Sequence, residues 1–267
     1  MLNITRKIVE ALNITGPFNI QFIAIDNAIK VIECNVRAAR SFPFVSKVTD
    51  HNFIETAVQV MLGKHKKKHY ETLELDYVGV KTPQFSYSRL KGANPVAHVE
   101  MASTGEVACL GENLLEAFYN SWLATEQNIA GKRILASIGG DRKVRLLAEL
   151  QKLEELGWEI YSTENTHDFI TRRGVASHFL YKGSQELEPN VISTIANKSV
   201  DLIINIPRSV QTMSHHTDGY KIRRLAIDHH IPLITNIHIA QMFLQCLTEL
   251  DPNKIPVKSW QEYVKQR

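Results

Sequence analysis

The sequence predicts an α/β protein with two parts: an α+β part in residues 1–128 and a doubly wound, mostly parallel α/β domain in residues 129–267. Strand-like and helix-like apolar patterns alternate regularly in the second part, which is typical of a parallel sheet covered on both faces. The first part is less regular and contains a β-hairpin pattern near its start. The change of pattern falls near Asn128 and sets the predicted boundary.

The composition excludes several classes of protein. Hydrophobic residues make up 44% and charged residues 22% of the chain, which is the balance of an ordinary globular protein. The net charge of +3 predicts no nucleic-acid-binding surface, and no apolar run is long enough to span a membrane. Cys34, Cys109 and Cys246 are widely spaced, so we expect no disulfide framework and no zinc site, and a reducing, cytoplasmic compartment.

Apolar spacing and turn residues place the elements of the first part. Gly16-Pro17 ends the first predicted helix, and Asp26-Asn27-Ala28 is the predicted turn of the hairpin. The lysine-rich run at residues 64–69 is interpreted as a charged loop rather than a basic patch. The predicted helices are residues 5–12, 52–62 and 113–123, and the predicted strands are residues 18–25, 29–35, 78–83 and 95–101.

The second part is predicted to alternate five strands with five helices. Gly157 and Gly174 close two of the helices, and Pro189 begins another. Ligands of such folds bind at the carboxyl ends of the strands. The predicted strands are residues 134–138, 158–162, 176–181, 201–206 and 232–235, and the predicted helices are residues 143–156, 168–173, 189–197, 220–229 and 237–250.

The hairpin carries the most informative polar pattern. Glu33, Asn35 and Arg37 alternate along the second strand, so their side chains share one face. A three-residue turn at residues 26–28 would place Gln21 opposite Glu33 on that face. Carboxylate and amide oxygens suit Mg²⁺, and an adjacent arginine suits phosphate groups. The alternative is a hairpin with a solvated polar face, and spacing alone does not separate the two interpretations.

Several long motifs add a resemblance. Residues 16–22 read GPFNIQF, residues 31–47 read VIECNVRAARSFPFVSK, residues 79–90 read GVKTPQFSYSRL and residues 100–108 read EMASTGEVA. These motifs resemble the C-terminal part of carbamoyl-phosphate synthetase large subunits, essentially from end to end. The resemblance implies that residues 1–128 are the end of the second ATP-grasp unit and residues 129–267 a methylglyoxal-synthase-like regulatory domain. The whole enzyme would be a ligase that phosphorylates carbamate with ATP.

The same resemblance assigns roles on the hairpin. Gln21, Glu33 and Asn35 match residues that bind the Mg²⁺ or Mn²⁺ ions of metal–ATP, and Arg37 matches a residue that contacts phosphate. The expected partners are ATP, bicarbonate or carbamate, the remainder of the synthetase and a glutaminase subunit or domain. The preceding lobe and the nucleotide-covering loop of the family are not in this sequence. We therefore expect the isolated chain to bind ATP weakly or not at all and to lack synthetase activity.

A second set of candidate residues lies in the regulatory part. Thr163 and Thr166 follow a predicted strand and precede a predicted helix, where hydroxyls and free N–H groups form a natural phosphate pocket. A plain helix cap is the alternative. The resemblance places Thr163, Thr166, Lys182 and Asn205 in the effector site.

The resemblance also bears on which effector binds. Lys182 matches a lysine of the nucleotide-inhibited, pyrimidine-pathway enzymes, where the urea-cycle enzymes that N-acetylglutamate activates carry a tryptophan. Arg208 and Gly219 stand where the urea-cycle type carries asparagines. These positions favour a uridine nucleotide as effector, with a phosphoribosyl diphosphate activator and the N-acetylglutamate type as alternatives.

The sequence allows two other functions to be considered. The chain would be a free-standing nucleotide sensor if it regulated a synthetase in trans. A methylglyoxal synthase activity is disfavoured, because that lyase needs an aspartate in the loop after the third strand. The corresponding loop, residues 182–186, reads KGSQE, and Asp141 lies after the first strand instead.

Overall fold

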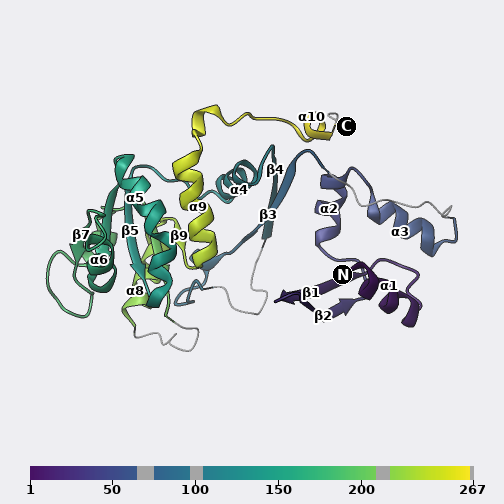
Figure 1. Cartoon of the computed structure of the whole chain (residues 1–267), viewed down its shortest axis with the longest axis horizontal. Helices are drawn as coiled ribbons and strands as arrows, with labels where there is room; N and C mark the ends of the chain where they lie inside the picture. The colour runs from purple at the N-terminus through teal and green to yellow at the C-terminus, as the bar shows by residue number, and fades with distance from the viewer. Residues whose placement is uncertain (65–74, 97–104, 209–216, 265–267) are drawn as a thin grey trace. The chain divides into compact units, whose positions relative to one another are not determined.

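The computed structural model describes residues 1–64, 75–96, 105–208 and 217–264. These residues form two compact units, shown in Figure 1: unit 1 comprises residues 1–77 and 258–267, and unit 2 comprises residues 78–257. Residues 78–128 therefore pack with the second part of the chain, while the domain limit at residues 128/129 stays a prediction. No helix among the described residues is both long enough and apolar enough to cross a membrane.

Unit 1 contains the predicted hairpin and three N-terminal helices. The first and third helices and both hairpin strands were predicted within a few residues of their ends. The second helix was not predicted, because Pro43 interrupts its pattern; Pro43 stands in the first turn, where no intrahelical N–H bond is lost. The elements are α1 (Leu2–Ala11), β1 (Asn19–Ile25), β2 (Ala28–Asn35), α2 (Ser41–Thr49), α3 (Phe53–Met61) and α10 (Trp260–Val264).

The short helix α10 returns to unit 1 from the far end of the sequence. The rings of Tyr77 and Tyr263 lie 5.7 Å apart, and these two side chains are the only buried ones in the described part of unit 1. The Tyr77 hydroxyl donates to the Val48 carbonyl at 2.6 Å, and the Trp260 indole donates to the Lys47 carbonyl at 2.6 Å. Residues far apart in the sequence thus make up the small core of this unit.

Unit 2 begins with an antiparallel pair, β3 (Val78–Gln84) and β4 (Gly105–Gly111), against which α4 (Leu114–Leu123) packs. The strand at residues 78–83 and the helix at residues 113–123 are confirmed. The predicted strand at residues 95–101 lies outside the described residues, apart from residues 95–96, which are not in a strand. The lysine-rich loop, likewise, lies outside them except for Lys64.

The strand β4 was not predicted, because its glycine, glutamate and alanine residues give a weak strand pattern. A Cβ atom at Gly111 would lie 2.3 Å from the backbone nitrogen of Ala117 in α4. The glycine is therefore required for α4 to approach the strand that precedes it.

The rest of unit 2 confirms the doubly wound α/β prediction. Five parallel strands lie in the order β7-β6-β5-β8-β9. The predicted helix at residues 143–156 is α-helical only over Leu147–Glu155, because Gly140–Leu146 forms a 3₁₀ helix. The strands are β5 (Arg133–Ile138), β6 (Glu159–Thr163), β7 (His178–Leu180), β8 (Leu202–Ile206) and β9 (Leu233–Ile234), and the helices are α5 (Leu147–Glu155), α6 (Glu164–Thr171), α7 (Val191–Ala196), α8 (Asp218–Asp228) and α9 (Ile237–Glu249).

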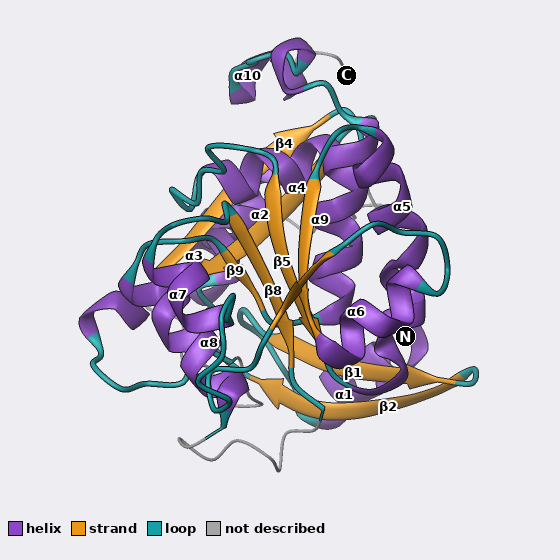
Figure 2. Ribbon diagram, turned by 90° about the vertical axis from the view of Figure 1, so that its left-hand side faces the viewer, coloured by secondary structure: helices purple, strands orange, loops and turns teal. Residues whose placement is uncertain are grey.

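Alternate residues of the central strands face two separate cores, as expected for a sheet covered on both faces. On β8, Ile204 faces the core formed with α5, α6 and α9, and Ile203 faces the core formed with α7 and α8. Figure 2 shows these two groups of helices on opposite sides of the sheet. Trp122 of α4 joins the first core, so α4 is integral to unit 2.

A partly buried ion pair joins β5 to the residue before β8. The Arg133 guanidinium donates to both carboxylate oxygens of Asp201 at 2.9 Å, and the Arg133 backbone N–H adds a third bond at 3.1 Å. The Asp201 side chain is only 7% exposed. Its hydrogen bond with Arg133 lowers the pKa of the Asp201 carboxyl.

This pair predicts an acid-dependent loss of stability. Since the folded-state pKa of Asp201 lies below the unfolded value of about 3.9, the stabilisation is fully present above that pH and is lost as the pH falls through the folded-state pKa. In Asp201→Asn this contribution to the pH dependence should be absent. Urea unfolding at pH 7 and at stepped pH values below about 4 measures it. The exposed Asp168→Asn should retain the wild-type dependence, and an unchanged dependence in Asp201→Asn would refute the prediction.

Candidate functional site

The hairpin turn differs from the predicted one. Ile25 pairs with Ala28, so the turn contains only Asp26 and Asn27. Both turn residues have positive φ, at 49° and 64°, as in the tight turns that match the twist of a hairpin. The predicted three-residue turn is therefore wrong, because Ala28 already belongs to β2.

A β-bulge nevertheless brings the predicted pair together. Phe22 pairs with Val31, but the next residue back, Gln21, pairs with Glu33, so Ile32 is the extra residue of β2. Without this shift the two-residue turn would have placed Gln21 opposite Ile32. The predicted pairing of Gln21 with Glu33 is confirmed, and its cause is the bulge rather than the turn.

The hairpin presents oxygen donors of the kind that hard divalent cations bind. The Asn35 amide donates to Glu33 Oε1 at 2.8 Å, which places these two side chains on one face. One carboxylate and the two amides of Gln21 and Asn35 fit Mg²⁺ or Mn²⁺ better than softer metals. The described residues contain no cluster of three or more His, Cys, Asp or Glu side chains. A metal at the hairpin would thus complete its shell with phosphate or water oxygens.

Arg37 lies beyond the end of β2. Its side chain is exposed, and its guanidinium donates to the Ala38 carbonyl at 3.2 Å rather than to the three candidate metal ligands. The structure therefore brings Gln21, Glu33 and Asn35 together, and leaves Arg37 beside them on the following segment.

The second candidate site lies where the winding of the parallel sheet reverses, between β5 and β8. Thr163 ends β6, and its hydroxyl donates to the Ser137 hydroxyl of β5 at 3.2 Å. Asn205 of β8 donates from its amide to the Ser137 carbonyl at 3.4 Å. The structure thus brings Thr163 and Asn205 together around Ser137, which the sequence did not indicate.

Thr166 is already engaged within the fold. Its side chain is 1% exposed, and its hydroxyl accepts a hydrogen bond from the Ile138 N–H at 3.0 Å. This contact joins the first turn of α6 to the end of β5. The helix-cap alternative is wrong for Thr163, whose side chain makes no cap hydrogen bond although it is the N-cap residue of α6.

We expect Thr166→Val to lower the free energy of unfolding by about 1–3 kcal/mol, because the buried N–H of Ile138 would lose its acceptor. Valine keeps the shape of threonine, so the effect isolates the hydroxyl. Urea unfolding followed by tryptophan fluorescence measures it. Thr166→Ser retains the hydroxyl and serves as the control. A Thr166→Val protein as stable as Thr166→Ser would contradict the assignment.

Cationic side chains surround the carboxyl edge of the sheet. Lys182 follows β7, and its ammonium lies 3.3 Å from Glu164 in the first turn of α6. Two further cations, Lys143 and Arg208, follow β5 and β8 and were not among the predicted site residues. Burial, and then the charge of Arg208, lower the pKa of Lys143. The signal available in the sequence was a basic residue shortly after each of these strands.

Gly139 allows the loops after β5 and β8 to meet. A Cβ atom at Gly139 would lie 2.7 Å from the backbone nitrogen of Arg208. The Gly139 N–H also donates to the Ile206 carbonyl at 2.8 Å. This close approach brings Gly139 and Arg208 together at the point where the winding reverses.

Two family models match the chain. Residues 1–69 match the carbamoyl-phosphate synthase L chain, ATP binding domain, and residues 145–235 match the MGS-like domain. The first match contains the whole hairpin, and the second contains the candidate effector-site residues Thr163, Thr166, Lys182 and Asn205.

Full-length relatives extend the likeness over nearly the whole chain. The multifunctional protein URA2 of Saccharomyces cerevisiae is 46% identical over 91% of this chain and 12% of its own length. The mitochondrial carbamoyl-phosphate synthase (ammonia) of Homo sapiens is 40% identical over 97% of this chain and 18% of its own length. The chain thus spans less than a fifth of either relative.

A solved structure also aligns with part of the chain. It is the crystal structure of methylglyoxal synthase from Elizabethkingia anophelis, with 19% sequence identity and a TM-score of 0.36, and it covers 51% of this chain and 91% of that protein. The two family matches and the relatives settle the affiliation. The chain belongs to the carbamoyl-phosphate synthetase family, and it holds part of an ATP-binding domain of the large chain followed by an MGS-like domain.

Proposed function

We propose that the chain is the C-terminal part of a carbamoyl-phosphate synthetase, which forms carbamoyl phosphate from bicarbonate, ATP and the ammonia of glutamine. The observation that carries this proposal is the hairpin, where a β-bulge places Gln21 opposite Glu33 within the segment that matches an ATP-binding domain. Unit 2 supplies the regulatory site. The gene sequence upstream distinguishes this proposal from a free-standing sensor. A reading frame that continues upstream into the rest of an ATP-grasp domain would support the synthetase.

In this proposal Gln21, Glu33 and Asn35 hold the Mg²⁺ or Mn²⁺ of metal–ATP through their side-chain oxygens. A bound divalent cation neutralises charge on a transferring phosphoryl group. The exposed guanidinium of Arg37 can turn from the Ala38 carbonyl toward a phosphate oxygen. A hydrogen bond between these two groups is strong because both the donor and the acceptor are charged.

The exposed apolar side chains of unit 1 suggest that the remainder of the synthetase packs against it. Its hairpin and the segment at residues 54–62 expose large apolar side chains, and exposed apolar surface of this kind often marks an interface. We propose that the rest of the ATP-grasp domain covers them and that a glutaminase subunit or domain supplies ammonia. The exposed side chains are Ile23, Ile25, Val31, Ile32, Ile54, Val58, Met61 and Leu62.

The effector that we propose is a uridine nucleotide. Its phosphates would lie near the N-terminus of α6, where backbone N–H groups favour an anion and Lys182, Lys143 and Arg208 supply positive charge. Thr163 and Asn205 contribute a hydroxyl and an amide at the same edge. A uridine triphosphate carries more negative charge than the two carboxylates of N-acetylglutamate and therefore suits three cations better. The free thiols of Cys34, Cys109 and Cys246 fit our proposal of a cytoplasmic location.

Calorimetric titration of the chain with uridine mono- and triphosphate, and separately with N-acetylglutamate, tests the effector. We expect the nucleotides to bind, and Lys182→Met to weaken binding by at least about tenfold, the usual worth of a charge-assisted hydrogen bond. Lys152→Met, which removes an exposed charge from α5, is the matched control. Binding of N-acetylglutamate without binding of either nucleotide would overturn the assignment.

A further inference from the structure

Arg223 of α8 is a buried cation behind the candidate effector site. Its side chain is 2% exposed, and it forms no ion pair with any described residue. One amino group, Nη1, donates to Asn205 Oδ1 at 2.7 Å, and Nε donates to Asn94 Oδ1 at 2.8 Å. Burial lowers the pKa of Arg223 to about 10, so the side chain remains charged at neutral pH. A buried arginine held by two amide oxygens instead of a carboxylate requires an explanation.

The chemistry of the guanidinium fixes the orientation of the Asn205 amide. A guanidinium only donates hydrogen bonds, so Asn205 must turn its carbonyl oxygen toward Arg223. The NH₂ group of Asn205 then points the opposite way, toward the Ser137 carbonyl at the carboxyl end of β5. That bond is long, at 3.4 Å, so the NH₂ group has capacity for a second, stronger acceptor.

We infer that Arg223 is a positioning residue, which holds the Asn205 amide so that the effector site offers a hydrogen-bond donor at this point. The inference rests on the proposed effector function. It specifies the chemistry of the ligand atom that meets Asn205, which is an acceptor such as a phosphate, carbonyl or hydroxyl oxygen. A ligand that presents a donor there would meet the amide NH₂ of Asn205 and be rejected.

Gly219 leaves room for this pair. A Cβ atom at Gly219 would lie 3.1 Å from Arg223 Nη1 and 3.6 Å from Asn205 Oδ1. A larger side chain would therefore press on the hydrogen bond between Arg223 and Asn205. The Nη2 group of Arg223 is buried and has no hydrogen-bond partner among the described residues, so the guanidinium retains one donor beyond those that hold Asn205 and Asn94.

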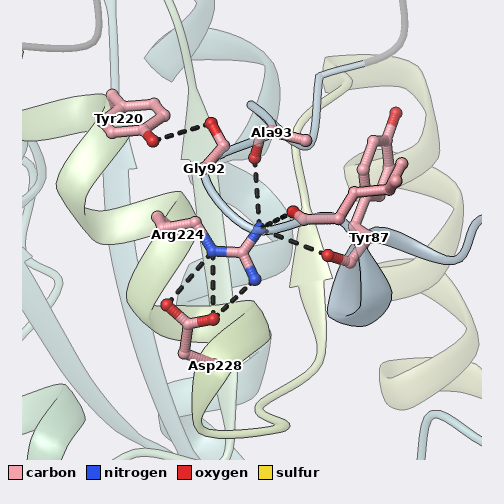
Figure 3. A network of polar contacts seen from close by, with 7 residues as sticks. Tyr87, Gly92, Ala93, Tyr220, Arg224 and Asp228 are labelled. Carbon is pink, nitrogen blue, oxygen red and sulfur yellow. Dashed lines mark hydrogen bonds and ion pairs between the residues drawn. The ribbon is translucent and has the colours of Figure 1, made fainter.

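The segment at residues 87–94, which lies outside the matched MGS-like domain, holds α8 in place. Figure 3 shows the guanidinium of Arg224 between Asp228 and this segment, and the Tyr220 hydroxyl donating to the Gly92 carbonyl, at 2.8 Å. Arg224 Nη1 donates to the carbonyls of Tyr87, Leu90 and Ala93 at 3.2, 3.0 and 3.3 Å. Asn94 continues the same segment to Arg223. The effector site thus depends on residues that precede the regulatory domain.

The side-chain amide signals of Asn205 test the positioning without any ligand. In ¹⁵N-labelled chain these signals are assigned by their loss in Asn205→Asp. We expect Arg223→Met to shift or broaden them, because the Asn205 oxygen loses its donor, and we expect Arg223→Lys to restore signals near the wild-type positions. Asn94→Ala, which leaves Arg223 itself in place, should give a smaller shift in the same direction. The exposed Arg172→Met is the matched control.

Titration with uridine monophosphate tests the consequence for binding. We expect Arg223→Met to weaken binding by at least about tenfold, Arg223→Lys by much less, and Arg172→Met not at all. Unchanged Asn205 signals in Arg223→Met would overturn the positioning role. Changed signals with unchanged affinity would overturn its importance for the ligand. If the wild-type chain binds no uridine nucleotide, the proposed effector fails, while the amide signals still decide the role of Arg223.

Discussion

Replacing Phe243 by alanine is expected to lower the free energy of unfolding of unit 2 by about 3–5 kcal/mol. The Phe243 side chain is fully buried, and its ring lies 4.3 Å from that of Trp122. Alanine would leave a cavity between α9 and α4, and the surrounding strands and helices can fill it only in part. An unchanged stability would mean that α4 does not share the core of the parallel sheet.

Fluorescence can report this loss from unit 2 alone. Trp122 and Trp158 belong to unit 2 and Trp260 to unit 1, so a Trp260→Phe background removes the signal of unit 1. Leu123→Ala is the matched control on α4, because Leu123 is 41% exposed and a surface substitution should cost no more than about 0.5 kcal/mol. Trp122 precedes the predicted boundary at residues 128/129 in the sequence, and Phe243 follows it. A large effect would therefore show that the segment at residues 78–128 folds with the regulatory domain.

The second large effect is expected on catalysis, in a complete synthetase that contains this sequence. Glu33→Ala should lower the rate of carbamate phosphorylation by at least about 100-fold, because a metal ligand contributes several kcal/mol to the stabilisation of a transferring phosphoryl group. Glu33 is the sole carboxylate among the three candidate ligands Gln21, Glu33 and Asn35. Formation of ATP from ADP and carbamoyl phosphate measures the same step in reverse.

Two variants separate the role of the metal from that of the hairpin. Glu33→Gln keeps an oxygen that can accept from Asn35 but removes the charge, so its activity should fall less and recover in part at high Mn²⁺ concentration. Glu10→Ala removes the same charge from α1 and should leave the rate unchanged. A Glu33→Ala enzyme with wild-type rate and metal dependence would contradict the proposed site.

The order of strands and helices in unit 2 could be predicted because its local signals agree. Each central strand is a short run that contains isoleucine, as in the LIINI of Leu202–Ile206, and glycine lies close to the borders of β5 and β6. The order of the strands in the sheet comes from packing instead. The ends of strands are predicted less well. The pattern predicted a strand at residues 232–235, but β9 contains only Leu233 and Ile234.

The hairpin shows how a correct prediction can rest on a wrong cause. The alternation of Glu33 and Asn35 was readable, since strand side chains have a period of two. The bulge at Ile32 was not, because an extra residue leaves no compositional mark on an exposed apolar strand. Turn length and bulge changed the register by opposite amounts, so Gln21 met Glu33 all the same.

The buried arginine could not have been found from the pattern. Arg223 lies in a helix rich in charged residues, and only tertiary structure shows that it points inward while Arg224 points to the segment at residues 87–94. Two adjacent arginines carry no signal of which is buried. The contacts that decide it join residues about 130 positions apart.

The return of α10 to unit 1 has a consequence for synthesis on the ribosome. Tyr77 emerges before the whole of unit 2, and its partner Tyr263 emerges after it. At roughly 5–20 residues per second, translation of unit 2 separates the two rings by on the order of ten seconds or more. During that interval the Tyr77 side chain lacks the ring that packs against it in the small core of unit 1. Chaperones that bind nascent chains would find their substrate in this unit until Tyr263 has been made.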